Sequence, residues 1–219
     1  MPPYLTTKNI AKKTKRWLKE IEPYNVHQYK LAEKSALMVI DMQKYFIKPG
    51  AGTYHASGAA IIGNVKKLIG KFREVKRPVI FTHHVHKPDF SDAGIMQWWW
   101  DDMCIEGSED AEIYDELSPL PDEKIISKHR YDAFYNTDLE TILRVQKIED
   151  IVITGVMTNL CCESTARGAY YRDYRVHFTA DATGTVSEEM HRASLLNLSF
   201  GFARITTTET IIKELDIRS

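Results

Sequence analysis

The sequence has few cysteines and no long apolar run, and each shortage excludes a class of protein. Its 219 residues contain three cysteines, Cys104, Cys161 and Cys162. An odd number of cysteines with two adjacent is not a disulfide framework, so we expect free thiols and a cytoplasmic setting. No apolar run approaches the roughly 18 residues of a membrane span, and no apolar stretch follows the basic N-terminal residues as a secretory signal requires. We therefore expect no membrane partner.

Neither sign of charge is in excess, because 29 Lys and Arg oppose 30 Asp and Glu for a formal net charge of -1. Nucleic-acid binding needs a basic excess on one face, so we expect no nucleic-acid partner. No G-x-G-x-x-G motif follows the first apolar run, which disfavours a dinucleotide-binding loop. With 43% hydrophobic and 27% charged residues, the composition is that of an ordinary globular protein.

Residues 1–34 form a basic segment ahead of the main domain, which we place at residues 35–219. The segment holds eight Lys or Arg and three Glu. Its apolar residues recur at partial helical spacing and a proline follows them: Ile10, Trp17, Leu18, Ile21 and Pro23. We expect a helix packed on the domain or on a partner subunit. A basic interaction arm is the less favoured alternative, because runs of charge are usually solvated faces.

Strand and helix patterns alternate through the main domain. Short apolar runs typical of buried parallel strands occupy residues 36–41, 78–82, 124–127, 150–155, 175–180 and 203–206. Helical patterns occupy residues 65–72, 109–117, 139–146, 161–172 and 187–200, and a last helix ends near residue 215. Six strands alternating with helices predict an α/β fold with a six-stranded parallel sheet and helices on both faces.

Polar residues at the ends of these strands predict a site, because open α/β sheets bind ligands at the carboxyl ends of their strands. Asp41 ends the first strand, Lys128 ends the third, and Cys161 opens the helix after the fourth. A helix N-terminus and a nearby lysine both favour a thiolate. Asp41 would take the thiol proton and later give it to a leaving group, while backbone N–H groups bind an oxyanion. This set predicts attack on a carbonyl through a thioester.

Three blocks of sequence carry a resemblance to a known family. They are Ala36-Leu-Met-Val-Ile-Asp-Met-Gln43, Lys128 with residues 131–139 (YDAFYNTDL), and residues 154–166 (TGVMTNLCCESTA). In this order they resemble the isochorismatase-like cysteine hydrolases, relatives of nicotinamidase and N-carbamoylsarcosine amidohydrolase, over about residues 35–206. The resemblance implies a three-layer, Rossmann-like fold.

The resemblance also assigns roles to individual residues. It implies a catalytic triad of Cys161, Asp41 and Lys128, a cis peptide bond between Val156 and Met157, and an oxyanion hole formed by the N–H groups of Met157 and Cys161. The choice of Cys161 over Cys162 rests on alignment to the family's Gly-Val-x-Thr pattern. A homo-oligomer is implied in the same way.

Further residues near the strand ends are candidates for the substrate pocket. Those we single out are Gln43, Phe46, His84, Trp98, Trp99, Tyr131 and Thr158. Three adjacent tryptophans, residues 98–100, cannot all face one way. One interpretation is that one or two of them wall the pocket and the others pack at a subunit interface; the alternative is ordinary packing of this loop on the domain.

His83, His84 and His86 raise the question of a metal. The metal-binding nicotinamidase branch of the family has Asp-x-His at this position and a further His. Here His84 stands in place of that Asp. Imidazoles still bind zinc, but a complete site needs a third protein ligand, for which Asp89 and Asp92 are possible candidates without a pattern. We therefore predict no metal and no cofactor.

These observations predict a cysteine hydrolase that cleaves a small non-peptide amide or related C–N bond. One alternative is an isochorismatase-type hydrolase of a vinyl ether, which uses Asp41 as an acid and does not need the thiol. Another is a non-catalytic scaffold or redox sensor, supported only by Cys162 and the basic segment. A Cys161→Ala variant with full activity would favour the first alternative.

Overall fold

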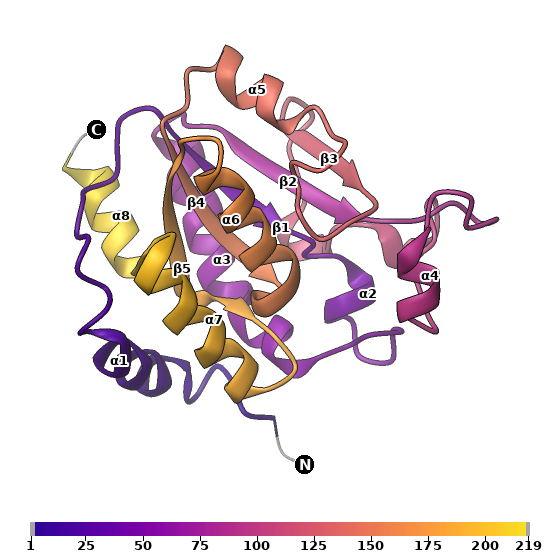
Figure 1. Ribbon diagram of the computed structural model, residues 1–219, viewed down its shortest axis with the longest axis horizontal. Coiled ribbons are helices and arrows are strands. Elements are labelled where there is room, and N and C mark those ends of the chain that lie inside the picture. Colours follow the sequence, from indigo (N-terminus) through magenta and orange to yellow (C-terminus); the bar gives the residue numbers. More distant parts are fainter. Residues whose placement is uncertain (1–2, 218–219) are drawn as a thin grey trace.

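The computed structural model describes residues 3–217, and its centre is a six-stranded sheet (Figure 1). The strands are β1 (Ser35–Ile40), β2 (Val79–His84), β3 (Lys124–Lys128), β4 (Asp150–Val156), β5 (Arg175–Gly184) and β6 (Arg204–Thr206). Their order is β3-β2-β1-β4-β5-β6 and every neighbouring pair is parallel. The order reverses between β1 and β4, where such folds place their ligands. The predicted Rossmann-like sheet is confirmed.

Burial explains why these segments form strands. Every residue of β1 and of β4 is buried, as central parallel strands covered on both faces require. The edge strand β3 exposes three of its five residues, and only Ile126 and Lys128 are buried. Strand β3 therefore ends in a buried lysine, Lys128. Buried charged side chains are rare, so this position at the carboxyl edge of the sheet is a candidate for function.

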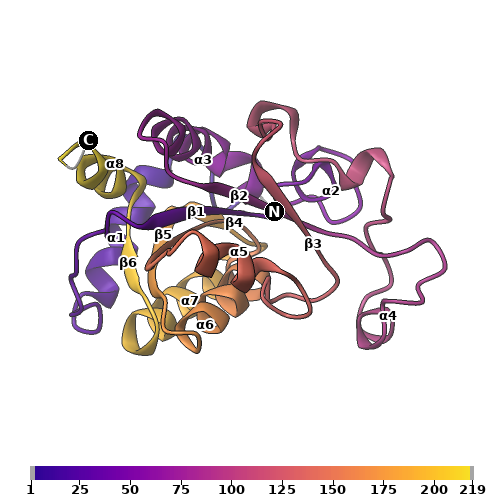
Figure 2. The same ribbon diagram turned by 90° about the horizontal axis from the view of Figure 1, so that it is seen from above.

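Helices cover both faces, with α3 and α8 on one side and α5, α6 and α7 on the other (Figure 2). The helices are α1 (Ile10–Ile21), α2 (Lys44–Ile47), α3 (Ala56–Glu74), α4 (Ile95–Trp99), α5 (Leu139–Val145), α6 (Glu163–Tyr170), α7 (Glu188–Gly201) and α8 (Thr208–Asp216). The segment with α4 projects beyond the carboxyl edge of the sheet (Figure 2). No helix among residues 3–217 is both long and apolar enough to cross a membrane.

One predicted helix is wrong. Residues 109–117 form two short 3₁₀ turns, Glu109–Ala111 and Asp115–Leu117, rather than one helix. Ile113 lies between them and pairs with Gln43 in an isolated antiparallel bridge. This extended pairing replaces the helical hydrogen bonds that the apolar spacing predicted.

The N-terminal segment packs against the domain of its own chain. Trp17 and Ile21 of α1 are buried in the same core as β1 and β4. Glu188, at the start of α7, pairs with Lys13 and Arg16 and accepts a hydrogen bond from Trp17 Nε1 at 2.8 Å. Part of the basic charge of α1 is therefore neutralised within the chain.

Candidate active site

Asp41, Lys128 and Cys161 meet at the carboxyl edge of the sheet. Lys128 Nζ lies 2.7 Å from Asp41 Oδ2 and donates to Cys161 Sγ at 3.3 Å. Asp41 and Lys128 are completely buried, and Cys161 is nearly so. The three residues come from the ends of β1 and β3 and from the π-helical turn η3 (Thr158–Cys162) that follows β4. An acid, a cation and a thiol are thus placed in mutual contact.

A glycine near the end of β4 allows Cys161 to lie beside Asp41. Gly155 has φ of +112°, and a Cβ there would lie 2.0 Å from the carbonyl oxygen of Ile40. Only glycine therefore allows the end of β4 to lie against the end of β1, next to Asp41. The peptide bond between Val156 and Met157 is cis, and η3 begins directly after it.

The second cysteine of the pair points elsewhere. Cys162 is completely buried, and its Sγ lies 4.0 Å from the carbonyl oxygen of Thr154 in β4. Cys161, by contrast, lines a pocket. The structure therefore separates the two thiols in the way that the alignment to the family pattern implies.

The thiol of Cys161 is neutral in this arrangement. Burial and the Asp41 carboxylate raise the pKa of Cys161, and Lys128 lowers it by less. Burial lowers the pKa of Lys128, but Asp41 and Cys161 outweigh burial and raise it overall. The sequence predicts that the helix N-terminus and Lys128 lower the pKa of this thiol, but burial and Asp41 outweigh them. The thiol proton must leave during the reaction.

Asp41 is held in place from β2. Thr82 Oγ1 donates to Asp41 Oδ1 at 2.5 Å and accepts from the Asp41 N–H at 3.1 Å. These contacts fix one carboxylate oxygen and leave Oδ2 toward Lys128. Asp41 adopts φ of +48°, a left-handed conformation that aspartate tolerates better than most residues.

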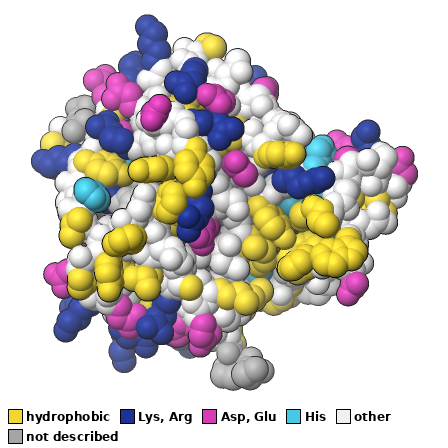
Figure 3. All heavy atoms as spheres, in the orientation of Figure 1, with side chains coloured by type: hydrophobic (Ala, Val, Ile, Leu, Met, Phe, Trp, Pro, Cys, Tyr) yellow, Lys and Arg dark blue, Asp and Glu magenta, His cyan; other side chains and the backbone are white. Residues whose placement is uncertain are grey.

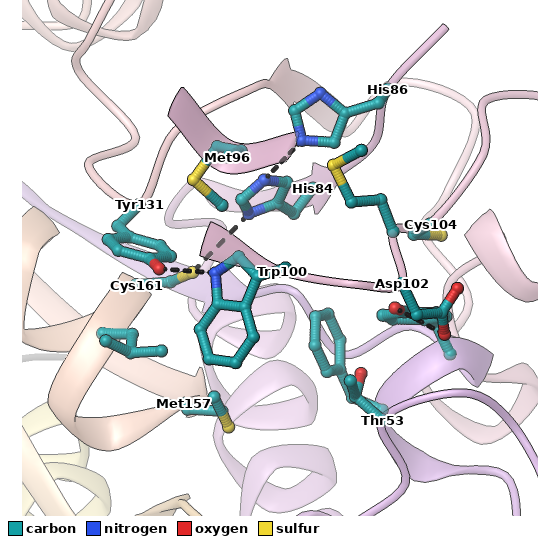
Figure 4. A pocket seen from close by; sticks show the side chains of 14 residues that line it. Thr53, His84, His86, Met96, Trp100, Asp102, Cys104, Tyr131, Met157 and Cys161 are labelled. Carbon is teal, nitrogen blue, oxygen red and sulfur yellow. Dashed lines mark hydrogen bonds between the residues drawn. The ribbon is translucent and has the colours of Figure 1, made fainter. Parts of the chain in front are cut away.

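The pocket above Cys161 has aromatic and sulfur-containing walls (Figure 4). Its larger apolar side chains are Tyr45, Phe46, Met96, Trp100, Met103, Tyr131, Met157 and Leu160. Trp100 Nε1 donates to the Tyr131 hydroxyl at 2.8 Å and joins two walls. None of the described residues that line the pocket is Lys or Arg, and Asp102 accepts a hydrogen bond from Tyr45 at 3.1 Å. Aromatic walls without a Lys or Arg suit a flat molecule that carries no anionic group.

The structure divides the predicted pocket residues into two groups. Phe46, His84 and Tyr131 line the pocket. Gln43 does not, because its buried amide binds the backbone of His84 on both sides, through His84 N at 2.8 Å and His84 O at 3.2 Å. Thr158 is also turned away, and its hydroxyl lies 2.9 Å from Nδ1 of the buried His191.

The tryptophans are divided differently from the prediction. Trp98 and Trp99 are 74% and 63% exposed, whereas Trp100 lines the pocket. The reason is local: α4 ends at Trp99, and Trp100 is extended, with φ of -123° and ψ of 134°. Hydrophobic side chains gather near α4 on the face shown in Figure 3. Sequence reasoning identified the cluster and chose the wrong members.

Two groups of His, Asp and Cys side chains bring possible ligand atoms within 4.8 Å of one another among the described residues. The first, Asp41, His84 and Cys161, surrounds the Lys128 ammonium, a cation already in place. The second contains His86, Asp92 and His129.

The donor set does not fit the metal of the nicotinamidase branch. An imidazole, His84, replaces the carboxylate of the Asp-x-His pattern. Both ring nitrogens of His86 already have partners, His84 Nε2 at 3.2 Å and Asp92 Oδ1 at 3.3 Å. The sequence named Asp92 only as a possible ligand without a pattern, and it did not point to His129, which lies far from His86 along the chain.

Comparison with known proteins agrees with this geometry. A sequence model of the isochorismatase domain matches residues 35–210. The chain belongs to the isochorismatase family. It is 38% identical to nicotinamidase 3 of Arabidopsis thaliana, over 83% of this chain and 88% of that protein. It is 29% identical to a ureidoacrylate amidohydrolase of Cronobacter sakazakii, over 84% of this chain and 89% of that protein.

A solved structure extends the similarity to three dimensions. The cysteine hydrolase of Pseudomonas syringae pv. phaseolicola 1448A superposes with a TM-score of 0.83 at 30% identity, covering 89% of this chain and all of that one. The predicted family and fold are confirmed.

Proposed function

We propose that this chain is a cysteine hydrolase that converts a small, neutral, flat carboxamide into a carboxylic acid and ammonia. The observation that carries the proposal is the buried Asp41–Lys128 pair in contact with Cys161 on the floor of an aromatic pocket. A thiol beside a carboxylate has a base to take its proton, and a fixed ammonium balances the charge as the proton moves.

The first half of the reaction forms a thioester. The Cys161 proton passes to Asp41 Oδ2 while Sγ attacks the amide carbonyl carbon and forms the S–C bond. The N–H groups of Met157 and Cys161 hold the oxyanion. When the tetrahedral intermediate collapses, the C–N bond breaks and the proton on Asp41 moves to the departing nitrogen, so that ammonia leaves.

The second half regenerates the enzyme. Asp41 takes a proton from water as its oxygen attacks the thioester carbon. The C–S bond breaks, and the proton returns from Asp41 to Cys161. Lys128 keeps its charge throughout, since its pKa is raised by Asp41 and Cys161 against the effect of burial. One water is consumed, and one acid and one ammonia are formed.

The pocket walls favour an uncharged substrate. A substrate with a carboxylate needs a cation to replace its lost water, and no Lys or Arg is among the described residues that line the pocket. Of the two relatives' substrates, nicotinamide is a neutral aromatic amide and ureidoacrylate carries a carboxylate. The walls therefore match an amide of the nicotinamide type better.

Ammonia release from nicotinamide, benzamide and ureidoacrylate tests this function. We expect turnover of the neutral amides by the wild type and by Cys162→Ala, and none by Cys161→Ala. Full turnover by Cys161→Ala would support acid catalysis by Asp41 and contradict the covalent route. Reversible peroxide modification of Cys161 with no amide turnover would favour the redox-sensor alternative.

We also infer that the chain assembles with copies of itself in the cytoplasm, with residues 1–34 as an extension of the domain at 35–219. Three large apolar side chains on α4, Ile95, Trp98 and Trp99, are more than 60% exposed, which is unusual for a single chain. Light scattering of the wild type and of a Trp98→Ser, Trp99→Ser variant tests the assembly. A wild-type monomer would contradict it.

A further inference from the structure

A line of hydrogen-bonded side chains extends from the triad toward the protein surface. Lys128 Nζ lies 3.3 Å from His84 Nδ1, and His84 Nε2 lies 3.2 Å from His86 Nε2. His86 Nδ1 lies 3.3 Å from Asp92 Oδ1. Figure 4 shows His84 between His86 and Cys161, with both rings at the edge of the pocket. The proposed reaction uses none of these three residues: His84, His86 and Asp92.

The direction of every hydrogen bond in this line follows from its first member. An ammonium has only donors, so Nδ1 of His84 must be the acceptor. A neutral imidazole then carries its hydrogen on Nε2, which donates to His86 Nε2. His86 in turn carries its hydrogen on Nδ1, which donates to the Asp92 carboxylate. One assignment of hydrogens thus satisfies all three contacts.

Both ends of the line are firmly held. Asp92 accepts from the Lys87 N–H at 3.2 Å through both carboxylate oxygens, and His129 Nδ1 lies 3.3 Å from its Oδ2. The Gln43 amide clamps the backbone of His84, as described above. Burial and then Lys128 lower the pKa of His84, so its ring is neutral and remains an acceptor.

We propose that His84 is a positioning residue for Lys128, and that His86 and Asp92 orient it. This arrangement would stand in place of the metal of the nicotinamidase branch. Lys128 Nζ shares its three hydrogens among four partners: the neutral acceptors His84 Nδ1 at 3.3 Å and Arg130 O at 3.1 Å, and Asp41 and Cys161. The neutral acceptors fix the ammonium where it bridges the carboxylate and the sulfur. The catalytic meaning of this role rests on the proposed function.

The rate at which iodoacetamide alkylates Cys161 measures this role without any knowledge of the substrate. The reagent is itself a small neutral amide, and mass spectrometry distinguishes Cys161 from Cys104 and Cys162. Four variants decide the question. His84→Leu removes the acceptor, and His84→Asn keeps an acceptor and a donor without an imidazole. Asp92→Ala removes the far end of the line, and His83→Ala is the control.

His83 suits the control because it is the adjacent imidazole on β2 and binds Ser127 Oγ at 2.5 Å instead. Loss of one hydrogen bond to a charged group corresponds to about a tenfold effect, so we expect His84→Leu to slow alkylation about tenfold. His84→Asn should stay within about threefold of the wild type, and Asp92→Ala should slow the reaction about threefold. His83→Ala should react like the wild type.

Three outcomes would overturn the proposal. The first is a wild-type rate in His84→Leu or, if that variant does not fold, in Asp92→Ala. The second is a rate in His84→Asn as slow as in His84→Leu. That result would point to imidazole chemistry on the thiol, since His84 Nδ1 lies 3.9 Å from Cys161 Sγ. The third is stoichiometric zinc in the purified protein that Asp92→Ala loses. An enzyme that alkylates as expected but hydrolyses no amide would contradict the proposed function alone.

Discussion

Two buried carboxylates lie at opposite ends of the sheet and have different kinds of partners. Asp41 follows β1 at the carboxyl edge, and Asp150 begins β4 at the amino edge; neither is exposed to solvent. Asp150 accepts from the Ala32 N–H at 2.7 Å, Arg175 Nε at 2.6 Å and His177 Nε2 at 2.9 Å. Asp41 accepts from Thr82 and pairs with Lys128.

The difference lies in what remains for each carboxylate to do. Burial alone would raise the pKa of Asp150, but His177 and the Ala32 N–H outweigh it and lower the pKa. Every partner of Asp150 is a donor, so the network holds it as an anion. Asp41 Oδ2 faces the Lys128 ammonium and the Cys161 thiol, so it can accept the proton of that thiol. A buried acid surrounded by donors serves structure, and one that faces a thiol can serve chemistry.

The largest effect should come from the carboxyl end of the sheet. We expect Cys161→Ala and Asp41→Asn each to lower kcat/KM for a neutral amide by about 10³-fold or more, because each removes a member of one catalytic unit. Cys162→Ala should stay within about threefold, because this thiol packs against β4. Steady-state ammonia release checks all three. Equal losses at Cys161 and Cys162 would contradict the assignment.

A substitution at the amino end of the sheet should lower the stability of the fold rather than the activity. Asp150→Ala leaves the buried His177 and the half-exposed Arg175 without their shared acceptor, and a buried polar group left without its partner costs about 1–3 kcal/mol. We expect the free energy of unfolding in urea to fall by about that amount while kcat at 20 °C, per folded molecule, stays near the wild-type value. Asp41→Asn should lose activity, and it should lose stability as well, because it leaves the buried Lys128 ammonium without its carboxylate partner. If Asp150→Ala lost activity without losing stability, the two carboxylates would not be separable in this way.

The lowered pKa of Asp150 should change how the free energy of unfolding depends on pH. A folded-state pKa below the unfolded value of about 3.9 contributes stability above that pH, which is lost as the pH falls further. Asp150→Asn removes this contribution, so its stability should fall less steeply below about pH 4, by up to about 1.4 kcal/mol per pH unit. Urea unfolding of both proteins between pH 3 and 7 measures the difference. Parallel curves would contradict it.

Much of this comparison could be predicted from the sequence. The central strands β1 and β4 contain short apolar runs, and the polar residues that end the strands are visible, so the order of the strands is enough to place Asp41, Lys128 and Cys161 at one edge. The charge state of the thiol could not be predicted, because burial belongs to the folded molecule. Asp92 and His129 meet His86 only through a loop and a strand end that are about 40 residues apart in sequence.

The direction of each tryptophan side chain could not be predicted from the sequence either. Helical spacing says which positions share a face, but the direction of Trp100 depends on where α4 ends. The end of so short a helix cannot be read from the sequence, because no glycine or proline directly follows α4 to mark it. Gln43 was misplaced for a related reason: its amide satisfies the backbone of a neighbouring strand, and no local pattern records that.

The smallest effects should separate Trp100 from its two neighbours. Trp100→Phe removes the Nε1 donor to Tyr131, and one neutral hydrogen bond of about 1 kcal/mol corresponds to roughly a fivefold loss of kcat/KM. Trp98→Ser with Trp99→Ser should leave kcat/KM within about twofold, because both side chains point to solvent in the single chain. Kinetics and light scattering on the same samples check this. If the serine variant is monomeric and also loses activity as Trp100→Phe does, then the partner copy supports the pocket wall through α4, and the exposed face of this helix and the pocket wall that follows it act together.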